Sequence, residues 1–433
     1  MLKFFERLPL AIIFAVLGAG LVLGTLVMTR PLFRLYLSAH DAPPLAGMQI
    51  HQARPRFSLK GIMDGSFQKS SELLLEDVFP LRAAIVRATN QIYYSLFARS
   101  YMFRNEIIVG KRQYLYETVY LGHYCNTMRE KHTPEEFDQW AKNIESLGDF
   151  FAKRGQIFLY VVTPSKAAYY PEYIPQWLDC NPQPPRPDYL LAAAALTHTH
   201  VPYIDLSKLM IDGKGKYPLP LFNRGGTHWN MLAVALSARE IVAKISAQGK
   251  WQLPEVRFTY TIDNHPDGVD TDLLDVLNLW SPNRNYSTAR VTFTQTIASK
   301  SRAPRIAIVG GSFMRQMYNA LRETNMFERV DYYFYLVMEH VSQPGLPPPP
   351  PSPYTAEYYR ELLAADIVIL EENESNLKSP HVRVLEEALA RYAGGAPPEG
   401  RETFFTPDKL KLCPSGTRSN CLCAAIFTNV IQG

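Results

Sequence analysis

The stretch RIAIVGGSFMRQMYNAL, residues 305–321, determines the fold class that the sequence predicts. It begins with a continuous apolar run over 306–309, which is typical of a strand buried on both faces of a parallel sheet. Two glycines and Ser312 follow, and apolar residues then recur at the three- and four-residue spacing of an amphipathic helix. Ligands of open α/β sheets bind where strands end and helices begin. Ser312 is therefore the first candidate for a functional residue.

Helices and strands alternate along much of the chain on both sides of this stretch. We expect helices over 133–154, 187–198 and 356–364, and strands over 156–162, 201–206 and 366–370. The first of these helices is predicted to begin with a capping box formed by Thr133 and Glu136. This alternation predicts an α/β fold, a doubly wound parallel sheet with helices on both faces.

The chemistry expected of Ser312 follows from its position at the start of a helix. Free backbone N–H groups and the helix dipole there can stabilise the oxyanion of an acyl-transfer intermediate. A plain N-cap role is the alternative. A phosphate-binding turn is a weaker one, because Gly310 and Gly311 do not complete G-x-G-x-x-G and no P-loop lysine follows. The hydrolase motif G-x-S-x-G does not fit either, because Met314 occupies its last glycine position.

Two further polar side chains are expected near this serine. The segment 222–245, FNRGGTHWNMLAVALSAREIVAKI, predicts a glycine turn, a threonine cap and a helix with His228 in its first turn. The dipole there favours a neutral imidazole that can accept a proton. Asn373 follows the strand over 366–370 at the same sheet edge, where its amide could donate to an oxyanion. The alternatives are a surface or capping histidine and a loop-capping asparagine. Together the three side chains match a nucleophile, a base and an oxyanion donor.

The composition and the start of the chain limit the classes of function. The chain has 433 residues with a net charge of +4 and no dense run of Lys and Arg, which argues against nucleic-acid binding. Residues 8–29 carry no charge and would span about 33 Å as a helix, enough to cross a bilayer. We expect an uncleaved single-pass anchor, with a cleaved signal peptide as the alternative. The flanking basic residues leave its orientation open.

The expected domain organisation has four parts. The anchor occupies residues 1–30, and a linker rich in Pro, Ala and Gly occupies 31–56. A single α/β domain follows over 57–392. Within it the segment 71–98 predicts helices interrupted at Pro80, and 107–117 predicts a strand. Hydrophobic periodicity fades after 393, so a loosely held tail is expected over 393–433.

Neither the cysteines nor the acidic residues indicate a metal site. The five cysteines are scattered and odd in number, so they do not form a disulfide framework. Cys413, Cys421 and Cys423 lack a second C-x-x-C and a nearby histidine, so zinc is not expected. The aspartate-rich segment 263–275 has Leu274 where a calcium loop closes with glutamate, and we interpret it as a solvated loop. No metal and no cofactor are expected.

Several segments resemble one family. GGSF at 310–313 resembles the serine motif of SGNH hydrolases, and GTHWN at 226–230 resembles the D-x-H-W motif of the alginate O-acetyltransferase branch of that superfamily. The segments at 77–82, 162–175 and 368–374 are also similar to members of that branch. The resemblance covers about residues 57–389. It implies an SGNH-hydrolase-like, flavodoxin-like sheet, circularly permuted because the histidine precedes the serine.

The resemblance also implies an activity and a location. It implies a single-pass protein of the inner membrane, with its globular part in the periplasm, that transfers acetyl groups onto an exopolysaccharide. A multi-pass membrane acyltransferase is the implied source of the acetyl donor. Ser312 would be the nucleophile, His228 the base, and Asn373 with the Ser312 N–H the oxyanion donors. Lys166, and the aromatic residues Tyr169, Tyr170 and Trp177, could contact sugar, with packing as the alternative.

Two positions depart from the motifs of the family. Gly226 stands where the branch has the aspartate of its catalytic triad, and Gly311 stands where other SGNH enzymes have an aspartate. A histidine without a carboxylate partner loses the group that orients it. Another carboxylate could substitute, with Asp205, Asp212 and Glu374 as candidates; otherwise a dyad works slowly or the site is inactive. An acetylesterase and a non-catalytic polysaccharide-binding subunit are therefore the alternative functions.

Overall fold

The computed structural model describes residues 18, 45–46, 54–78, 82–101, 107–127, 132–178, 180, 186–295, 303–334, 339–341, 356–378, 382, 385 and 389. The chain divides into two compact units, each treated separately below. The first comprises Met1–Arg104, Leu274–Pro282 and Ala425–Gly433, and the second comprises Asn105–Leu273 and Asn283–Ala424. The domain predicted over 57–392 therefore contributes residues to both units. The predicted anchor, apart from Gly18, and the predicted tail lie outside the described residues.

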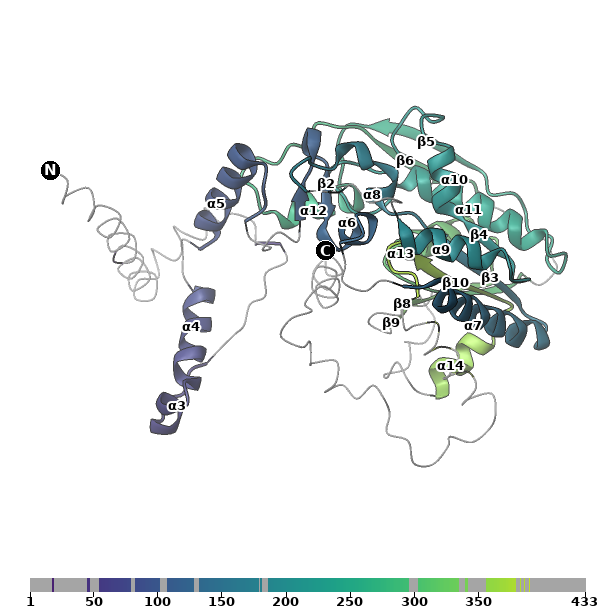
Figure 1. Ribbon diagram of the computed structural model, residues 1–433, viewed down its shortest axis with the longest axis horizontal. Coiled ribbons are helices and arrows are strands. Elements are labelled where there is room, and N and C mark those ends of the chain that lie inside the picture. Colours follow the sequence, from purple (N-terminus) through teal and green to yellow (C-terminus); the bar gives the residue numbers. More distant parts are fainter. Residues whose placement is uncertain are drawn as a thin grey trace. The chain divides into compact units, whose positions relative to one another are not determined.

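The second unit is built on a six-stranded sheet, shown in Figure 1. Five strands run parallel and the edge strand β9 is antiparallel. This confirms the predicted α/β fold with a parallel sheet. In spatial order the strands are β4 (Tyr203–Asp205), β3 (Ile157–Thr163), β10 (Ile367–Asn373), β7 (Arg305–Gly310), β8 (Arg329–Phe334) and β9 (Glu339–Val341).

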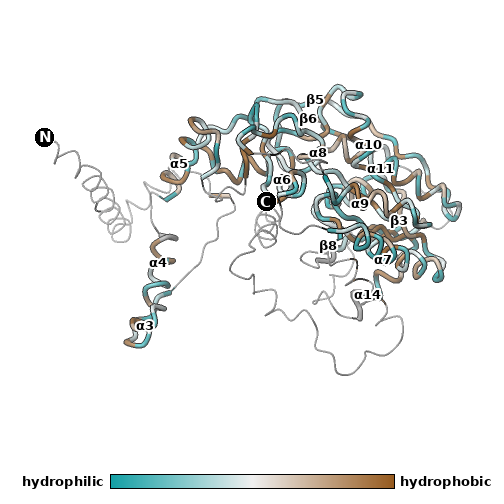
Figure 2. Tube along the Cα trace, in the orientation of Figure 1, coloured by the Kyte–Doolittle hydropathy of each residue, from teal (hydrophilic) through white to brown (hydrophobic). Residues whose placement is uncertain are grey.

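Helices cover both faces of this sheet. One face packs against α11 (Met231–Ser246) and α13 (Phe313–Glu323), and the other against α7 (Pro134–Lys153), α9 (Pro187–Leu196) and α14 (Ala356–Leu363). Side chains of β7 alternate between the two hydrophobic cores, with Ile306 and Ile308 in the first and Ala307 and Val309 in the second. All of these strand residues are at most 6% exposed. The continuous apolar runs of the strands follow from burial on both faces, and Figure 2 shows them along β3.

The strand order matches a known pattern when the strands are counted from β7 instead of from the start of the chain. Counted from β7, which precedes Ser312, the strands continue through β8 and β10 and then through β3 and β4. In that count the parallel strands lie side by side in the order 2-1-3-4-5, which is the flavodoxin-like order. The switch point of this order lies between β7 and β10. Ser312 is therefore placed beside the crevice where such sheets bind ligands.

The predicted start of α7 is present in detail. Thr133 Oγ1 accepts a hydrogen bond from the Glu136 N–H at 3.3 Å, and Glu136 Oε2 accepts one from the Thr133 N–H at 2.9 Å. Each side chain thus satisfies a backbone donor that the first helical turn leaves free. The capping box predicted from sequence is therefore confirmed.

Shorter elements complete the second unit. The predicted strand over 107–117 is a hairpin of two antiparallel strands, because a short 3-10 turn interrupts it. A separate two-stranded antiparallel sheet, formed by two strands that lie between α11 and β7 in the sequence, follows. These elements are β1 (Ile107–Val109), η1 (Lys111–Gln113), β2 (Leu115–Glu117), α6 (Thr118–Tyr124), α8 (Lys166–Tyr169), η2 (Pro171–Tyr173), α10 (Leu206–Asp212), β5 (Phe258–Asp263), η3 (Gly268–Asp270) and β6 (Thr288–Phe293). The helix α12 (Asp272–Val276) begins in the second unit with Asp272 and Leu273, and its residues from Leu274 on belong to the first.

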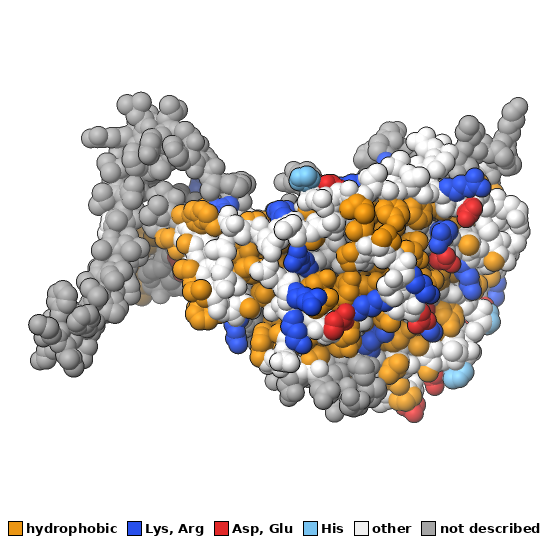
Figure 3. Space-filling model, turned by 90° about the horizontal axis from the view of Figure 1, so that it is seen from above, with side chains coloured by type: hydrophobic (Ala, Val, Ile, Leu, Met, Phe, Trp, Pro, Cys, Tyr) orange, Lys and Arg blue, Asp and Glu red, His pale blue; other side chains and the backbone are white. Residues whose placement is uncertain are grey.

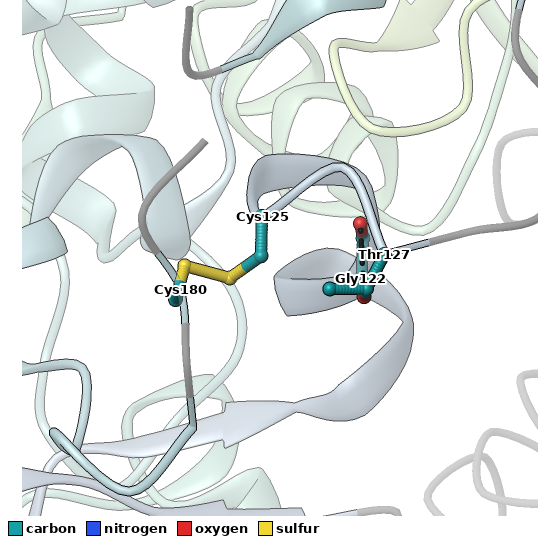
Figure 4. Close-up of a disulfide and its surroundings, with 4 residues drawn as sticks. All are labelled: Gly122, Cys125, Thr127 and Cys180. Carbon is teal, nitrogen blue, oxygen red and sulfur yellow. Dashed lines mark hydrogen bonds between the residues drawn. A yellow bond between two sulfur atoms is a disulfide. The ribbon is translucent and has the colours of Figure 1, made fainter. Parts of the chain in front are cut away.

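A disulfide joins Cys125, the residue that ends α6, to Cys180 (Figure 4). The sequence did not predict it, because the scattered cysteines show no pairing pattern. Both cysteines belong to a small hydrophobic cluster with Ile108, Tyr116 and Ile174. The bond therefore ties α6 to the segment that follows η2. The remaining cysteines of the predicted tail lie outside the described residues.

Removing this disulfide is expected to lower the free energy of unfolding by about 4 kcal/mol, because it closes a loop of 55 residues and so restricts the unfolded chain. Urea unfolding of the full-length protein with Cys125→Ser and Cys180→Ser measures the loss. Ser146→Ala, at an exposed position of α7, is the control and should leave the urea midpoint unchanged. An unchanged midpoint in the double variant would show that the bond does not form in solution.

Within the described residues 54–101 of the first unit there are three helices. They are α3 (Leu59–Met63), α4 (Ser66–Val78) and α5 (Arg82–Phe97). The interval between α4 and α5 contains Pro80, which agrees with the predicted interruption. α5 bonds to a later segment of the same unit, because Asn90 Nδ2 donates to the Leu277 carbonyl at 2.7 Å and the Ser281 N–H donates to Gln91 Oε1 at 2.9 Å. A search of the described helices finds none with the length and hydropathy of a membrane span.

Candidate active site

The turn after β7 presents the side chain of Ser312. Ser312 lies at the N-cap position of α13, but its hydroxyl makes no capping hydrogen bond. The simple N-cap interpretation is therefore wrong. The turn is crowded at Gly310, because a Cβ there would lie 2.7 Å from Glu371 Oε2 and 2.9 Å from Met314 Cγ. Glycine at 310 thus lets the chain pass close to the Glu371 side chain of β10 just before Ser312.

His228 lies directly against this serine. Its Nε2 atom is 2.9 Å from Ser312 Oγ, and its side chain is 2% exposed. The neighbouring Trp229 is fully buried, and its Nε1 donates to the Phe313 carbonyl at 3.1 Å. The Phe313 ring also packs on the imidazole, with 4.9 Å between ring centres. The THW segment is therefore fixed to the first residue of the serine helix.

The helix after His228 begins later than the sequence predicts. α11 starts at Met231, and its cap is Asn230, whose side chain accepts from the Ala233 N–H at 3.1 Å. Thr227 is therefore not the cap, and His228 is not in the first turn. His228 therefore lies outside the helix whose dipole was expected to act on it. What orients the ring is its pair of side-chain partners.

The second partner of His228 is Asp272, the first residue of α12. Its Oδ2 atom is 2.5 Å from His228 Nδ1, and its Oδ1 atom accepts from the Thr227 N–H at 2.7 Å. The carboxylate is thus held by the residue before the histidine as well as by the ring. Ser312, His228 and Asp272 form a continuous hydrogen-bonded chain. This is the arrangement of a serine–histidine–aspartate triad.

The interpretation of 263–275 as a solvated loop is therefore wrong for its second half. Asp270 and Asp272 are 5% and 9% exposed. A signal was available in the sequence, because the apolar residues Leu273, Leu274, Val276 and Leu277 follow Asp272 at helical spacing, and all four are buried. A segment with such an apolar face packs inside the protein. It carries the preceding aspartate inward.

The three carboxylates proposed from sequence have other partners. Asp205 accepts from the Lys208 N–H and from the Tyr189 hydroxyl, and Asp212 pairs with the Lys208 ammonium. Glu374 is buried, pairs with Arg186 and accepts from the Ser165 N–H and the Ser207 hydroxyl. The structure places Asp272 beside His228 instead.

Gly226 explains why the carboxylate comes from a different segment. A Cβ on Gly226 would lie only 2.0 Å from the Val269 carbonyl oxygen and 3.1 Å from the Asp270 carbonyl carbon. No side chain fits at this position while the 269–272 segment stays where it is. The backbone that blocks an aspartate at 226 is the same backbone that delivers Asp272. The glycine and the aspartate are thus two parts of one arrangement.

Lys166 and Asp270 hold the loop before His228 from two sides. Lys166 is 3% exposed, and its Nζ donates to the carbonyls of Arg224 and Gly226 at 2.8 and 2.6 Å. Burial holds the pKa of Lys166 well below its usual value, and nearby Asp272 opposes that shift. Asp270 Oδ1 accepts from Asn223 Nδ2 at 2.6 Å, and burial raises its pKa to about 6.

The sugar contact predicted for Lys166 is not what this arrangement shows. The ammonium faces two backbone carbonyls inside the protein and lies over the rings of Tyr114 and Tyr116 at 5.4 and 5.6 Å. It thereby positions the loop that carries the histidine. Tyr169 and Tyr170 are also buried, at 3% and 8% exposed, in agreement with the packing alternative, whereas Trp177 is 50% exposed.

Asn373 lies at the predicted sheet edge, but its amide is engaged. Its Nδ2 donates to Thr163 Oγ1 at 3.2 Å and to the Pro164 carbonyl at 2.8 Å, and its Oδ1 accepts from the Ser375 N–H. Both amide hydrogens therefore hold the end of β3, and in this arrangement the predicted oxyanion contact is not available. The Ser312 N–H is the remaining predicted donor. No described residue accepts a hydrogen bond from it.

Beneath the serine turn lies a buried carboxyl group. Glu371 is fully buried in β10, where its Oε2 accepts from the Gly311 N–H at 2.8 Å and its Oε1 accepts from the Thr163 hydroxyl. Burial raises the pKa of Glu371 to about 7, and the charge of Glu372 adds to the rise, while the two hydrogen bonds oppose it. Glu371 thus connects the residue before Ser312 to the end of β3.

Glu371 should make the protein less stable as the pH rises. The folded protein keeps this proton up to a pKa of about 7, whereas the unfolded chain releases it near its ordinary value of 4.5. Stability therefore falls between these values, by about 3 kcal/mol. Glu371→Gln cannot ionise and should lack this loss. Urea unfolding of both full-length proteins at pH 5 and pH 8 compares the two slopes. Equal losses of stability would contradict the assignment.

Comparison with known proteins places this chain in a family. A family model described as an SGNH hydrolase-like domain of the acetyltransferase AlgX matches residues 107–324, which is half of the chain. The matched range contains Ser312, His228 and Asp272. No curated protein gives a significant match to the chain.

Three solved structures are similar to the chain. The O-acetyltransferase domain of Pseudomonas putida AlgJ has 18% identity and a TM-score of 0.41, covering 65% of this chain and 99% of that one. Pseudomonas aeruginosa AlgX has 15% identity and a TM-score of 0.44, with 69% of each chain covered. Bacillus cereus PatB1 has 13% identity and a TM-score of 0.40, covering 64% of this chain and 98% of that one. On the evidence of the family model, this chain belongs to the family of SGNH hydrolase-like domains described for the acetyltransferase AlgX.

Proposed function

We propose that this protein is an O-acetyltransferase that moves acetyl groups onto a polysaccharide through an acetyl-serine intermediate. The observation that carries the proposal is the hydrogen-bonded chain from Ser312 through His228 to Asp272, at 2.9 and 2.5 Å. An activated serine with an adjacent base that is oriented by a third group is what nucleophilic acyl transfer requires. Membership of a family described for an acetyltransferase supports the choice of acyl group.

In the first half-reaction Ser312 Oγ attacks the carbonyl carbon of the acetyl donor. His228 Nε2 takes the proton of the hydroxyl as the new C–O bond forms, and Asp272 stabilises the resulting imidazolium. The Ser312 N–H donates to the oxyanion of the tetrahedral intermediate. The intermediate collapses when the donor's leaving group departs with the proton from His228. Ser312 then carries the acetyl group as an ester.

In the second half-reaction a sugar hydroxyl replaces the leaving group. His228 takes the proton of that hydroxyl while its oxygen attacks the acetyl carbon, and the proton returns to Ser312 Oγ as the ester breaks. The enzyme is then regenerated and the sugar carries the acetyl group. Transfer to water through the same steps would make the protein an acetylesterase. The acceptor is therefore the property that separates these two activities.

The location and partners are proposed on separate grounds. We place the globular part in the periplasm, held to the inner membrane through residues 8–29, with a multi-pass membrane acyltransferase as the source of acetyl groups. The Cys125–Cys180 disulfide supports an oxidising compartment. The strand order 2-1-3-4-5, counted from the serine strand, supports the proposal that the SGNH fold is circularly permuted.

The experiment follows the acetyl group on the full-length protein. An activated acetate ester should give serine-dependent turnover, and mass spectrometry of the quenched protein should find one acetyl group on the peptide that contains Ser312. Ser312→Ala should lower turnover about a million-fold, the scale of losing a serine nucleophile. Ser146→Ala, on the exposed side of α7, is the matched control and should keep full activity.

Product analysis with and without an oligosaccharide identifies the acceptor. Acetylated sugar that forms at the expense of free acetate would establish the transferase. Acetate alone, whatever the sugar, would assign the esterase activity. Unchanged turnover in Ser312→Ala would refute the serine mechanism for both activities.

A further inference from the structure

α5 buries the polar side chains Arg87 and Asn90 and exposes three large apolar ones. The inward residues Arg87, Asn90 and Tyr94 are at most 7% exposed. The outward residues Ile85, Ile92 and Leu96 are 43%, 51% and 73% exposed. A helix on the surface of a protein in water has the opposite arrangement. This reversal indicates that the outward face of α5 has an apolar environment in the working protein.

The outward residues form one continuous stripe. At 100° per residue, Ile85, Ala88, Ile92, Ser95 and Leu96 fall within about 100° of the helix circumference. All five are exposed, and none carries a charge. The hydrogen bonds from Asn90 to the Leu277 carbonyl and from the Ser281 N–H to Gln91 fix the rotation of the helix. The stripe therefore faces outward because the other face is already bonded.

Exposed hydrophobic side chains occur elsewhere on the protein as well. Figure 3 shows others on the face seen from above, where they lie among Lys and Arg side chains. In α5 they are distinguished by their helical spacing and by the absence of charge between them. Figure 2 shows the same helix as an alternation of hydrophobic and hydrophilic segments. A single exposed leucine needs no explanation, but a stripe of this kind does.

A second segment of the same unit combines apolar and basic residues. The stretch 54–63, RPRFSLKGIM, contains α3 and has three basic residues and no acidic one. Its large apolar side chains Phe57, Leu59 and Met63 are 74%, 78% and 89% exposed. Arg54, Arg56 and Lys60 are exposed as well. Apolar side chains that insert among lipids, with basic ones beside the headgroups, are typical of segments that bind the surface of a membrane.

We propose that the outward face of α5 and the stretch 54–63 bind the surface of a lipid bilayer that contains anionic lipids. Lipid tails cover the apolar side chains, and anionic headgroups pair with Arg54, Arg56 and Lys60. Each basic residue near an anionic surface contributes about 1 kcal/mol to binding. This step rests on the proposed anchor: residues 8–29 end 25 residues before Arg54, so a chain anchored there is long enough to reach the membrane surface and short enough to stay near it. This unit then lies on the membrane rather than across it.

Photo-crosslinking of the full-length protein in vesicles tests this proposal. A photoreactive phenylalanine analogue replaces Leu59, Ile92 or Leu96 in turn, and the vesicles contain phosphatidylglycerol. Mass spectrometry identifies the adducts. Ile262 is the matched control, because it is a 57% exposed isoleucine in strand β5 of the other unit. We expect lipid adducts at 59, 92 and 96, and at least tenfold fewer at 262.

Each other outcome overturns the proposal. Adducts at 92 and 96 with a second copy of the chain would assign the stripe to a dimer. Labels that react only with water, in protein whose circular dichroism is unchanged, would show that lipid does not cover it. In vesicles of phosphatidylcholine alone, the yield of the adduct at 59 should be lower than in vesicles that contain phosphatidylglycerol. An equal yield would show that the basic residues do not contribute to binding. The Ser312→Ala protein should give the same adducts, so this test stands apart from the proposed reaction.

Discussion

Asp272→Asn is expected to lower the turnover number about ten-thousand-fold, the scale that this exchange has in a serine protease. The asparagine amide can donate to His228 Nδ1 and so favours the tautomer in which Nε2 carries the proton. Nε2 then cannot take the proton of Ser312. The asparagine also lacks the charge that stabilises the imidazolium. Steady-state kinetics with an activated acetate ester measure the loss.

Asp272→Asn should lower activity without unfolding the protein. Asn retains an oxygen that can accept the Thr227 N–H, which now bonds to Asp272 Oδ1, so the start of α12 should stay in place. Asp267→Asn is the matched control in the same segment, because Asp267 is 71% exposed and pairs with Arg290. It should retain full turnover. If Asp272→Asn is as active as the control, Asp272 is not the partner that orients His228.

Gly226→Asp, which restores the aspartate of the family motif, is expected to lower the free energy of unfolding by about 3 kcal/mol or more and to abolish activity. Its Cβ alone would lie 2.0 Å from the Val269 carbonyl oxygen, so the 269–272 segment would have to move. That movement displaces Asp272 from His228. Urea unfolding and ester hydrolysis measure the two losses.

Gly226→Ala separates the effect of volume from the effect of charge and should show most of the loss of stability. Gly213→Ala is the milder comparison, because a Cβ there would lie 3.1 Å from the Leu209 carbonyl oxygen. Full activity in Gly226→Asp would mean that the new carboxylate serves His228 and that the 269–272 segment yields easily. Adding Asp272→Asn to that variant would then leave turnover unchanged.

The parts of the fold that the sequence predicts are those governed by local patterns. The apolar runs of β3, β7 and β10 predict the parallel sheet, and the Thr133–Glu136 pair predicts the start of α7. The sequence predicts the start of α11 at the wrong residue, because Thr227 and Asn230 are both good caps by residue type. Trp229 forms an isolated antiparallel β-bridge with Phe222 and is therefore extended, so the helix begins only after it, with Asn230 as the cap. The Cys125–Cys180 bond depends on tertiary contacts and has no local signal.

In the candidate site, too, local patterns predict some residues and miss others. Ser312 and His228 follow from their own segments, because each lies in a recognisable turn before a helix. The third group could not be found by spacing, since Asp272 is 44 residues from His228 and lies on another element. Lys166 and Asn373 stand at the expected sheet edge, yet their hydrogen-bond donors are taken up by carbonyl and hydroxyl oxygens inside the protein. Sequence patterns place such side chains but do not assign their partners.

The contact between Gly226 and the Val269 carbonyl has an evolutionary consequence. A side chain at 226 would displace the 269–272 backbone that places Asp272 beside His228. A protein that loses the aspartate at 272 likewise has no room for one at 226 while that backbone stays in place. Neither step is neutral alone, so the two positions should change together among descendants of this chain. A survey that selects active members of the family by an aspartate two residues before the histidine would discard this protein as inactive. A survey that asks for either pairing would retain it.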